Sequence, residues 1–324
     1  MYKLLKPFGR ISWETECVGD IVELVGLESG DPEERKAELD RKLAECDILQ
    51  ADVDIKVDEE LFSKAPNLKA VFCTSIGTDY VDLKAATEHG VIVANNPDFC
   101  ILAVAEYAVG MMYALMRNIP KGVEGVKEGN WAIRGSLGGA ELFGKTLGVI
   151  GFGKTGREVA RQAIGIGMDV NCYDPFMNEE LAAKLGAKPM AMEEVLKSAD
   201  VVTIHVPLMD ETRNLISYEQ FGLMKDGVYL VNCARGGIVN EEALLEALKS
   251  GKVKGAALDV LSEEPPKPDH ILLNYEGDNL IITPHIAWYT AEAAVKNHIF
   301  YSEQVRDFVE GRTPKAVANR DVLR

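Results

Sequence analysis

The chain has 324 residues, of which 47% are hydrophobic and 27% are charged, a length and composition typical of a globular protein with two domains. Its formal net charge of −16 argues against nucleic-acid binding, because that function requires a basic surface. No apolar run is long enough to span a membrane, and the amino terminus lacks the apolar stretch of a signal peptide, so we expect neither a membrane partner nor a leader.

The first 97 residues have the pattern of a small α/β unit. Short apolar runs predict strands at 48–53, 68–73 and 91–94. Helices are expected at 59–64, where Asp58 can cap the first turn, and at 80–89, after a loop at 74–79. The turn at 95–98 is the expected first domain boundary.

A long apolar helix is predicted at 101–117. It is apolar on most faces and contains no proline, so we expect it to be buried between domains or subunits. Glu106 is the charged exception, and it either has a partner or faces solvent. An amphipathic helix at 119–128 and a glycine-rich connector at 131–139 follow.

The motif G-x-G-x-x-G occurs as Gly151, Gly153 and Gly156, directly after an apolar run at 147–150. The first glycine permits a tight turn, the second lets backbone approach a pyrophosphate, and the third allows close packing of helix and strand. The helix that follows would point its N–H groups and its positive dipole end at the phosphates. The segment therefore predicts a dinucleotide-binding site.

An acidic residue, Asp174, ends the next apolar run at 168–173. A carboxylate at this position accepts hydrogen bonds from the adenosine ribose hydroxyls and repels a 2′-phosphate. The pattern predicts NAD rather than NADP. The alternative interpretation is a simple turn followed by a capping aspartate.

Strands and helices alternate through the rest of the chain. The predicted strands are 147–150, 169–173, 201–205, 228–232, 255–259 and 280–283, with a helix at 241–250. This order predicts a doubly wound sheet. Because the phosphate loop lies near the middle of the chain, we expect this domain to be inserted into the other one. A helix at 289–311 and the tail would return to the first domain.

The six cysteines contain no C-x-x-C pair, and most lie within apolar runs. Such a distribution is typical of reduced, buried thiols. We therefore expect a cytoplasmic protein without a metal site.

Polar residues follow the predicted strands of the second domain where those strands end: His205 and Pro207, the segment 232–237 with Arg235, Asp259 with Glu264, and His285. Ligands of open α/β sheets bind beyond these ends. A histidine can take the hydroxyl proton when hydride leaves an alcohol carbon, a carboxylate can stabilise the imidazolium, and an arginine can hold a substrate carboxylate. Taken singly, each residue could instead be a surface ion-pair partner, a loop acid or a structural histidine.

Several motifs together resemble the D-isomer-specific 2-hydroxyacid dehydrogenases over nearly the whole chain. The matching segments are 75–83, 96–97, 103–106, 151–156, 174–175, 205–208, 211–213, 232–236, 259–260, 264–265 and 284–286. The resemblance implies two domains, with a Rossmann NAD-binding domain at 98–285 inserted into a smaller flavodoxin-like substrate domain at 1–97 and 286–324. It also implies a homodimer.

The resemblance implies a role for each matching residue. Arg235 would bind the substrate carboxylate and carbonyl oxygen, His285 would be the acid/base, and Glu264 would be its partner. Backbone N–H groups of Ser75, Ile76 and Gly77 would hold the substrate carboxylate. The NAD site would comprise Gly151, Gly153, Lys154, Thr155, Gly156, Asp174, His205, Pro207, Thr212, Cys233, Ala234 and Asp259, with Asp259 on the nicotinamide carboxamide.

Some positions depart from the family pattern. Tyr80 stands where Asn or His is usual, and Trp288 replaces a common glycine in a sequence that resembles the glycerate/hydroxypyruvate branch. Phosphoglycerate dehydrogenases tend to place an arginine where this chain has Asp52, with Lys56 at their lysine, and a carboxylate would repel a phosphate. The chain ends soon after its last helix, so we expect no C-terminal regulatory domain.

We therefore expect an NAD-dependent dehydrogenase that interconverts a 2-oxo acid and its D-2-hydroxy acid. Phosphoglycerate dehydrogenase is the alternative among enzymes. A dinucleotide-sensing corepressor on the same fold is the alternative from another class, and the acidic, compact chain disfavours it.

Overall fold

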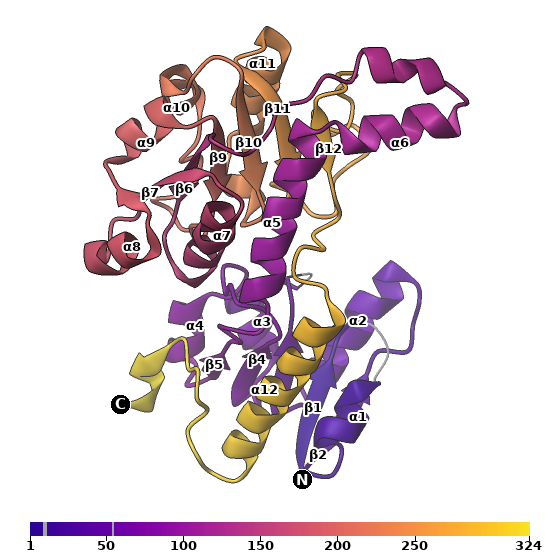
Figure 1. Cartoon of the computed structure of the whole chain (residues 1–324). Helices are drawn as coiled ribbons and strands as arrows, with labels where there is room; N and C mark the ends of the chain where they lie inside the picture. The colour runs from indigo at the N-terminus through magenta and orange to yellow at the C-terminus, as the bar shows by residue number, and fades with distance from the viewer. Residues whose placement is uncertain (9–11, 54) are drawn as a thin grey trace. The chain divides into compact units, whose positions relative to one another are not determined.

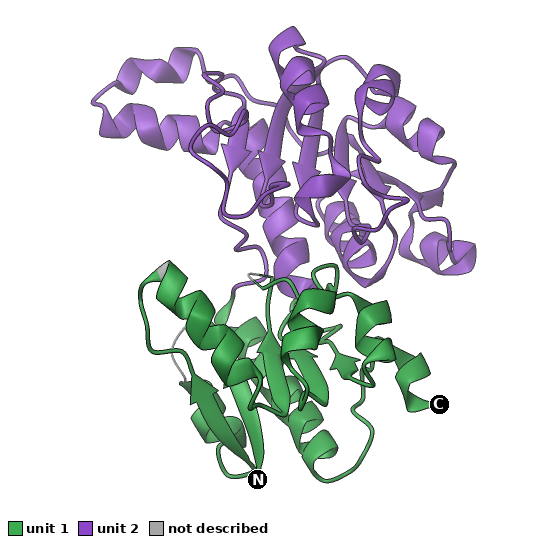
Figure 2. Cartoon of the chain, turned by 180° about the vertical axis from the view of Figure 1, so that it is seen from behind, with its two compact units in different colours: residues 1–100, 290–324 green, residues 101–289 purple. Residues whose placement is uncertain are grey.

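The computed structural model describes residues 1–8, 12–53 and 55–324, which form two compact units (Figure 2). Unit 1 comprises Met1–Cys100 and Thr290–Arg324, and unit 2 comprises Ile101–Tyr289. Unit 2 is thus inserted into unit 1 along the chain. The boundaries expected from the sequence, after residues 97 and 285, fall three and four residues earlier than these.

Unit 1 contains a five-stranded sheet in which all neighbouring strands are parallel. Its order, β2-β1-β3-β4-β5, is that of flavodoxin-like folds, which confirms the expected fold class. The strands are β1 (Tyr2–Lys6), β2 (Val22–Gly26), β3 (Ile48–Ala51), β4 (Ala70–Cys73) and β5 (Ile92–Ala94). All residues of β3 and β4 are buried. Buried strands require apolar residues, which is why the apolar runs at 48–53 and 68–73 predicted these two strands.

The helices of unit 1 are α1 (Trp13–Val18), α2 (Pro32–Leu43), α3 (Glu59–Lys64), α4 (Leu83–Glu88) and α12 (Ala291–Val309), with a 3₁₀ turn at Arg320–Leu323. Asp58 caps α3 as predicted, because it accepts a hydrogen bond from Leu61 N at 3.3 Å. The predicted helix at 80–89 begins later than expected. Asp82 accepts hydrogen bonds from Lys84 N and Ala85 N, so Leu83 is the first helical residue.

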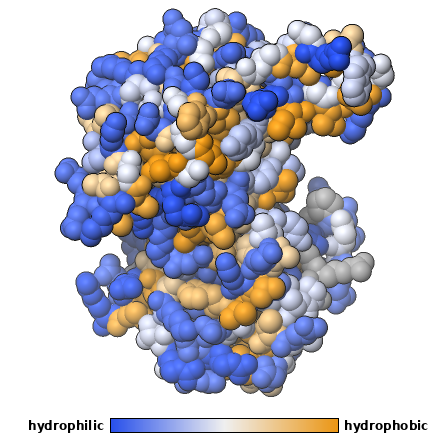
Figure 3. Space-filling model, in the orientation of Figure 1, coloured by the Kyte–Doolittle hydropathy of each residue, from blue (hydrophilic) through white to orange (hydrophobic). Residues whose placement is uncertain are grey.

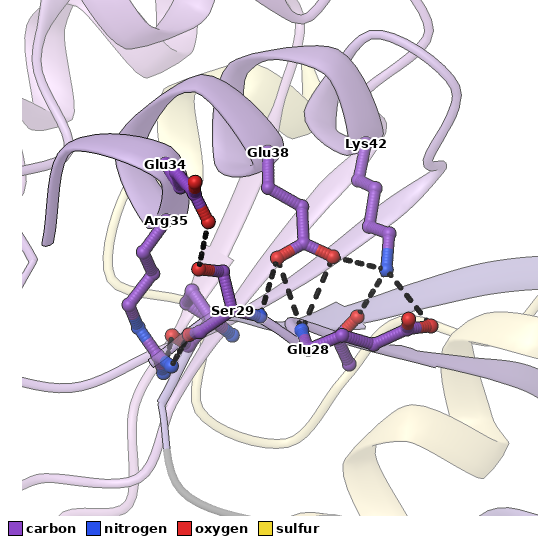
Figure 4. A network of polar contacts seen from close by, with 8 residues as sticks. Glu28, Ser29, Glu34, Arg35, Glu38 and Lys42 are labelled. Carbon is purple, nitrogen blue, oxygen red and sulfur yellow. Dashed lines mark hydrogen bonds and ion pairs between the residues drawn. The ribbon is translucent and has the colours of Figure 1, made fainter. Parts of the chain in front are cut away.

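A polar network holds α2 against the chain that follows β2 (Figure 4). Glu38 accepts hydrogen bonds from Glu28 N and Ser29 N at 3.0–3.1 Å and pairs with Lys42 Nζ at 2.7 Å. Lys42 also donates to Gly26 O at 2.7 Å. The bond from Lys42, followed by that from Ser29 N, lowers the pKa of Glu38 to about 2.

The carboxyl-terminal tail returns to unit 1, as predicted. Ala318 N donates to Val93 O at 2.8 Å, and Asn319 bonds both Val93 N and Val91 O at 2.8 Å. These bonds satisfy backbone groups of β5 and of Val91, the residue before it, at the edge of the sheet. The helix before the tail, α12, begins at Ala291 because Thr290 caps it.

Unit 2 contains a seven-stranded parallel sheet of order β12-β11-β10-β9-β6-β7-β8. The strands are β6 (Thr146–Ile150), β7 (Asp169–Tyr173), β8 (Lys188–Pro189), β9 (Val201–Ile204), β10 (Val228–Asn232), β11 (Val253–Leu258) and β12 (Leu280–Ile282). The chain winds outward in both directions from β6, so the crevice beyond the carboxyl end of β6 is the switch point where ligands bind. The doubly wound prediction is confirmed.

Helices cover both faces of this sheet (Figure 1). One face packs against α5 (Ile101–Met116), α7 (Lys154–Gly165) and α8 (Glu179–Leu185). The other packs against α9 (Met192–Ser198), α10 (Tyr218–Leu223) and α11 (Glu241–Ser250). The two apolar cores hold the strand ends, and the loops that follow them, in a fixed geometry.

One face of α5 is buried within unit 2. Its residues Ala105, Ala108 and Met112 are fully buried against the sheet and α7 inside unit 2. The predicted burial is thus supplied for these residues by the sheet and α7 of the helix's own unit, whereas Leu102 on another face of α5 is 44% exposed. Glu106 is exposed, so of the two possibilities considered for this charged residue, a partner or solvent, it faces solvent.

A group of exposed apolar side chains occurs on α6 (Ile119–Lys127) and the 3₁₀ turn after it (Trp131–Gly135). Ile119, Val123 and Val126 are each about half exposed, and Trp131 is 69% exposed. We call these four residues the α6 patch. Figure 3 shows apolar surface along this projecting helix.

Candidate active site

The glycine motif forms the turn between β6 and α7. Gly151 has φ +94°, and a Cβ there would lie 2.6 Å from the backbone of His205. A Cβ at Gly156 would collide with the carbonyl oxygen of Gly151. Only glycine therefore permits this turn and this close approach of helix to strand.

Open space lies over the second glycine. Nothing lies within 4 Å of the position that a Cβ of Gly153 would occupy, and Gly153 precedes the first residue of α7, Lys154. The first turn of a helix has N–H groups without intrahelical acceptors. With Thr155 following, this helix end has the space, the donors and the dipole that a pyrophosphate requires.

Asp174 directly follows β7, beside the glycine turn. Its Oδ2 accepts a hydrogen bond from Phe152 N and its Oδ1 one from Phe176 N, both at 2.8 Å. These two bonds fix the carboxylate next to the loop and leave its negative charge in place. The geometry fits an acid that meets the ribose hydroxyls of a dinucleotide.

The loop after β9 contains the next group of predicted residues. His205 N donates to Ile150 O at 2.7 Å, and the His205 ring bonds Thr203 Oγ1 at 2.9 Å. Burial lowers the pKa of His205 to about 4, so this ring is neutral at pH 7. Thr212 Oγ1 donates to Pro207 O at 2.6 Å, a bond that joins the two ends of the loop segment 207–212.

The loop after β10 carries Cys233, Ala234 and Arg235. Buried Asn232 ties this loop together, because its side chain accepts from Ala234 N at 3.0 Å and donates to Arg235 O at 2.9 Å. Arg235 also donates to Ala234 O at 2.9 Å. Cys233 is buried, and burial raises the pKa of its thiol well above the ordinary value, which favours the neutral thiol over the thiolate.

Gly236 brings the arginine loop against the loop that carries Glu264. A Cβ at Gly236 would collide with the backbone of Leu261 and Ser262. The contact places Arg235 close enough for its charge to lower the pKa of Glu264. The sequence predicted that Arg235 and Glu264 follow the ends of strands, and in the structure the loops that carry them are in direct contact.

His285 and Glu264 form a hydrogen-bonded pair. His285 Nδ1 lies 2.6 Å from Glu264 Oε2, and Glu264 Oε1 accepts from Leu261 N at 2.8 Å. Burial acts to raise the pKa of Glu264, but the bond with His285 and the charges of His285 and Arg235 hold it below its ordinary value. Glu264 is therefore an anion, and His285 carries a proton on Nδ1.

Asp259 anchors the loop that carries His285. Its buried carboxylate accepts hydrogen bonds from Thr283 Oγ1 at 2.6 Å, Ile286 N at 3.0 Å and Ala287 N at 2.7 Å. His285 itself has φ +53°, a conformation that costs energy for a residue with a side chain. The bonds to Asp259 hold it there.

A second histidine and carboxylate support the loop of Glu264, and sequence reasoning missed them. His270 Nε2 lies 3.1 Å from Glu241 Oε2, and both side chains are largely buried. Glu241 also accepts from Ser262 N and Ser262 Oγ, at 2.8 and 2.6 Å. Glu241 lies in the first turn of α11, where acidic residues are common because they favour the positive end of the helix dipole, so no sequence pattern distinguishes it as a partner of His270.

Unit 1 carries the predicted anion loop, Ser75–Gly77, after β4. Within residues 1–8, 12–53 and 55–324, the backbone N–H groups of Ser75, Ile76 and Gly77 have no hydrogen-bond acceptor. Asn95 and Asn96 fix the loop from the other side by donating to Ile76 O and Ser75 O, at 2.6 and 3.0 Å. Three N–H groups of one half-buried loop suit a carboxylate.

Tyr80 shapes this loop. Ser75 Oγ donates to Gly77 O at 2.8 Å and lies 2.7 Å from Tyr80 Oη. Because a serine hydroxyl has one hydrogen, Tyr80 is the donor to Ser75. Burial raises the pKa of Tyr80 far above its ordinary value, which keeps that proton in place.

The family description of D-isomer specific 2-hydroxyacid dehydrogenases, NAD-binding domain, matches residues 109–287. The chain therefore belongs to the D-isomer specific 2-hydroxyacid dehydrogenase family. NAD is the cofactor of this domain, which agrees with the glycine turn and Asp174.

Individual relatives agree with this assignment. The chain is 42% identical to D-3-phosphoglycerate dehydrogenase of Methanocaldococcus jannaschii over 305 residues. These aligned residues make up 94% of this chain and 56% of that protein. The chain spans about half the length of the curated relatives it matches.

Two solved structures are also similar. D-lactate dehydrogenase from Aquifex aeolicus, complexed with NAD and lactic acid, has a TM-score of 0.86 and 32% identity and covers 95% of this chain and 96% of its own. NAD-dependent formate dehydrogenase from Staphylococcus aureus, in complex with NAD, has a TM-score of 0.83 and 31% identity and covers 94% of each chain. Across the described residues of the present chain, we find no helix with the length and apolar character needed to cross a membrane.

Proposed function

We propose that this protein is an NAD-dependent dehydrogenase that interconverts a D-2-hydroxy acid and the corresponding 2-oxo acid. The observation that carries the proposal is the pair of His285 and Glu264, 2.6 Å apart at the carboxyl edge of an NAD-binding sheet. Hydride removal from an alcohol requires a base for the hydroxyl proton, and a histidine held by a carboxylate supplies one.

The proton would move through Nε2 of His285. Because Nδ1 carries a proton toward Glu264, Nε2 of the neutral ring is free to accept one during oxidation. In the direction of reduction, the protonated ring donates from Nε2 to the carbonyl oxygen. Glu264 keeps the ring oriented and stabilises its positive charge.

Arg235 would bind the substrate carboxylate and polarise its carbonyl oxygen. A guanidinium offers several donors in a fixed plane, which suits two neighbouring oxygen atoms. Asn232 positions the arginine by fixing the backbone of its loop. The N–H groups of Ser75, Ile76 and Gly77 in unit 1 are the second proposed carboxylate donors.

NAD, when bound, supplies the hydride acceptor or donor. Gly151, Gly153, Lys154, Thr155 and Gly156 would hold its pyrophosphate. Asp174 would bind the ribose and favour NAD over NADP. Asp259 would accept a hydrogen bond from the nicotinamide carboxamide through Oδ2, which also accepts one from Ala287 N. The remaining proposed contacts with NAD are His205, Pro207, Thr212, Cys233 and Ala234.

Two alternatives to the proposed function predict different substrates or different turnover. The names of the curated relatives favour phosphoglycerate dehydrogenase as a second candidate. A dinucleotide-sensing corepressor would bind NAD with little turnover. Oxidation of NADH with a panel of 2-oxo acids (glyoxylate, pyruvate, hydroxypyruvate and 3-phosphohydroxypyruvate) separates these functions from the proposed one.

We also propose that the protein is a cytoplasmic homodimer. The α6 patch supports a dimer, because clustered exposed apolar side chains are typical of protein interfaces. All six cysteines are free thiols, and five of them are buried, as in proteins of a reducing compartment. Sedimentation of wild type and Val123→Lys tests the dimer: the variant should be a monomer if the patch is the interface.

A further inference from the structure

One short segment of unit 2, Leu261–Ser262, binds two carboxylates through consecutive backbone N–H groups. Leu261 N donates to Glu264 Oε1 at 2.8 Å, and Ser262 N donates to Glu241 Oε1 at 2.8 Å. The first carboxylate belongs to the proposed catalytic pair, whereas the second comes from α11. Because the two donors are adjacent in the chain, a rotation of the peptide between them would also move the N–H group that holds Glu264.

Glu241 holds Ser262 through both of its oxygen atoms. Oε1 accepts from Ser262 N, and Oε2 accepts from Ser262 Oγ at 2.6 Å. Hydrogen bonds to an ionised carboxylate are stronger than those between neutral groups, and two of them fix the orientation of one residue. Glu241 begins α11, whose residues Leu244 and Leu248 are buried in the core on that face of the sheet. The carboxylate is therefore carried on a firmly packed helix.

His270 provides a third bond to Glu241. Leu272 N donates to His270 Nδ1 at 3.3 Å, so Nδ1 is an acceptor and Nε2 of the neutral ring carries the hydrogen. Nε2 lies 3.1 Å from Glu241 Oε2 and donates to it. The side chains of His270 and Glu241 are only 8% and 13% exposed, and a carboxylate so far from water needs such donors.

The same segment packs against the loop that carries Arg235. A Cβ at Gly236 would lie 1.9 Å from Leu261 C and 2.4 Å from Ser262 N, and the Leu261 side chain is buried in the core that α9, α10 and α11 cover. Apolar packing fixes where the segment lies but has no preference for the direction of a polar N–H group. That direction is determined by the bonds to Glu241.

We infer that Glu241, assisted by His270, is a positioning residue of the proposed catalytic pair. Glu241 orients the Leu261–Ser262 peptide, and Leu261 N in turn holds Glu264 Oε1. The other oxygen, Oε2, then lies 2.6 Å from His285 Nδ1. The inference rests on the proposed function, because acid/base catalysis requires the histidine to be held in one orientation by its partner.

The contrasting role for Glu241 is a general one, in which an acid in the first turn stabilises α11 through the helix dipole. Glu242 has the same charge in the same turn and is exposed. Glu242→Gln is therefore the matched control: it removes an equal charge from the helix start and leaves the bonds to Ser262 intact. Only the positioning role predicts that Glu241 variants alter the reaction and that Glu242→Gln does not.

The test is the pH profile of kcat and kcat/KM for reduction of a 2-oxo acid by NADH. Glu241→Ala should lower kcat by about tenfold and move the basic limb to lower pH, because a misaligned Glu264 stabilises the imidazolium less well. The KM for NADH should stay nearly the same. Asp259 and Arg235 are the other charged groups that act on the pair, and these variants retain both.

Conservative variants should restore part of the function. Glu241→Gln keeps an acceptor oxygen for Ser262 and should lose less activity than Glu241→Ala. His270→Gln keeps an N–H donor for Glu241 and should likewise be more active than His270→Ala. A double variant, Glu241→Ala with Glu264→Gln, shows whether the effect passes through Glu264: once that charge is gone, loss of Glu241 should move the basic limb no further.

Hydrogen exchange reports the orientation of the segment without any turnover. The peptide covering residues 259–265 should exchange about tenfold faster in Glu241→Ala than in wild type, because the bonds that hold its N–H groups are weakened. Glu242→Gln should exchange like wild type. The Tm of each variant verifies that it is folded at the temperature of the assay.

Two results would overturn the inference. One is a basic limb that stays in place in both Glu241→Ala and Glu241→Gln, or that moves as far in the Glu264→Gln background as in wild type. The other is unaltered exchange of residues 259–265 in Glu241→Ala. Absence of wild-type turnover with every 2-oxo acid tested, glyoxylate and pyruvate included, would instead overturn the proposed function and the inference with it.

Discussion

His285 Nδ1 and Glu264 Oε2 lie 2.6 Å apart, although 21 residues of chain separate them. Because the pKa of Glu264 is lowered in this setting, its carboxylate stays ionised through the neutral range. It can therefore stabilise the protonated imidazole that reduction of a 2-oxo acid requires.

Removal of the Glu264 charge should change the pH dependence of the reaction. Glu264→Gln keeps an acceptor for His285 but no longer stabilises the imidazolium, so the basic limb of the reduction profile should move to lower pH while activity at low pH remains. The measurement is kcat/KM for reduction from pH 5 to 10. Glu263→Gln, an exposed neighbour, is the control, and an unchanged basic limb in Glu264→Gln would show that the two groups are not coupled in catalysis.

Arg235→Lys should lower kcat/KM for the 2-oxo acid by at least about 100-fold, because lysine cannot form the planar two-pronged contact. The affinity for NADH, measured by fluorescence titration, should remain nearly unchanged. Arg161→Lys, at an exposed position of α7, is the control. Wild-type efficiency in Arg235→Lys would mean that Arg235 is structural and that the substrate carboxylate binds elsewhere.

Asp174 should make NADH the better cofactor by at least about tenfold in kcat/KM, because its charge opposes a 2′-phosphate. Asp174→Asn retains an oxygen acceptor for Phe152 N or Phe176 N and should narrow that gap, as should Asp174→Ala. Steady-state kinetics with NADH and NADPH provide the measurement. Equal kinetics with both cofactors in the wild type would contradict the assigned role.

Unit 1 should lose stability in acid partly through Glu38. Its pKa is about 2 in the folded chain against an ordinary value of 4.5, so its stabilising contribution is complete above pH 4.5 and is lost as pH falls toward 2. Glu38→Gln should lower the Tm at pH 7 and show a smaller further loss between pH 5 and 2.5. Glu34→Gln, on the same helix, is the control, and parallel pH dependences for wild type and Glu38→Gln would exclude this contribution.

The sequence predicted the parts of the fold that depend on local patterns. The glycine turn, Asp174 and the buried strands β7 and β10 require only an apolar run followed by a specific turn residue, and the structure has them at the predicted positions. The strands β1 and β2 were not predicted. Tyr2–Lys6 ends in a buried lysine, and most residues of Val22–Gly26 are only partly buried, so neither has the apolar pattern of a central strand.

Contacts between distant segments could not be predicted from the sequence. Lys6 pairs with buried Glu14 at 2.6 Å, and only the folded sheet shows that this lysine has a partner inside unit 1. The support that Glu241 and His270 give to the Glu264 loop depends on how α11 packs against that loop. The residue types of the candidate site could be read from strand ends, whereas the residues that position them required the tertiary structure.

The most direct test of the proposed function is the reduction of 2-oxo acids by NADH, with chiral analysis of the product, for wild type and His285→Ala. We predict that wild type reduces at least one of glyoxylate, pyruvate and hydroxypyruvate, and that any chiral product is the D-2-hydroxy acid. His285→Ala should bind NADH normally and lose roughly two to four orders of magnitude in kcat. Formation of the L isomer, or wild-type turnover in His285→Ala, would contradict the account.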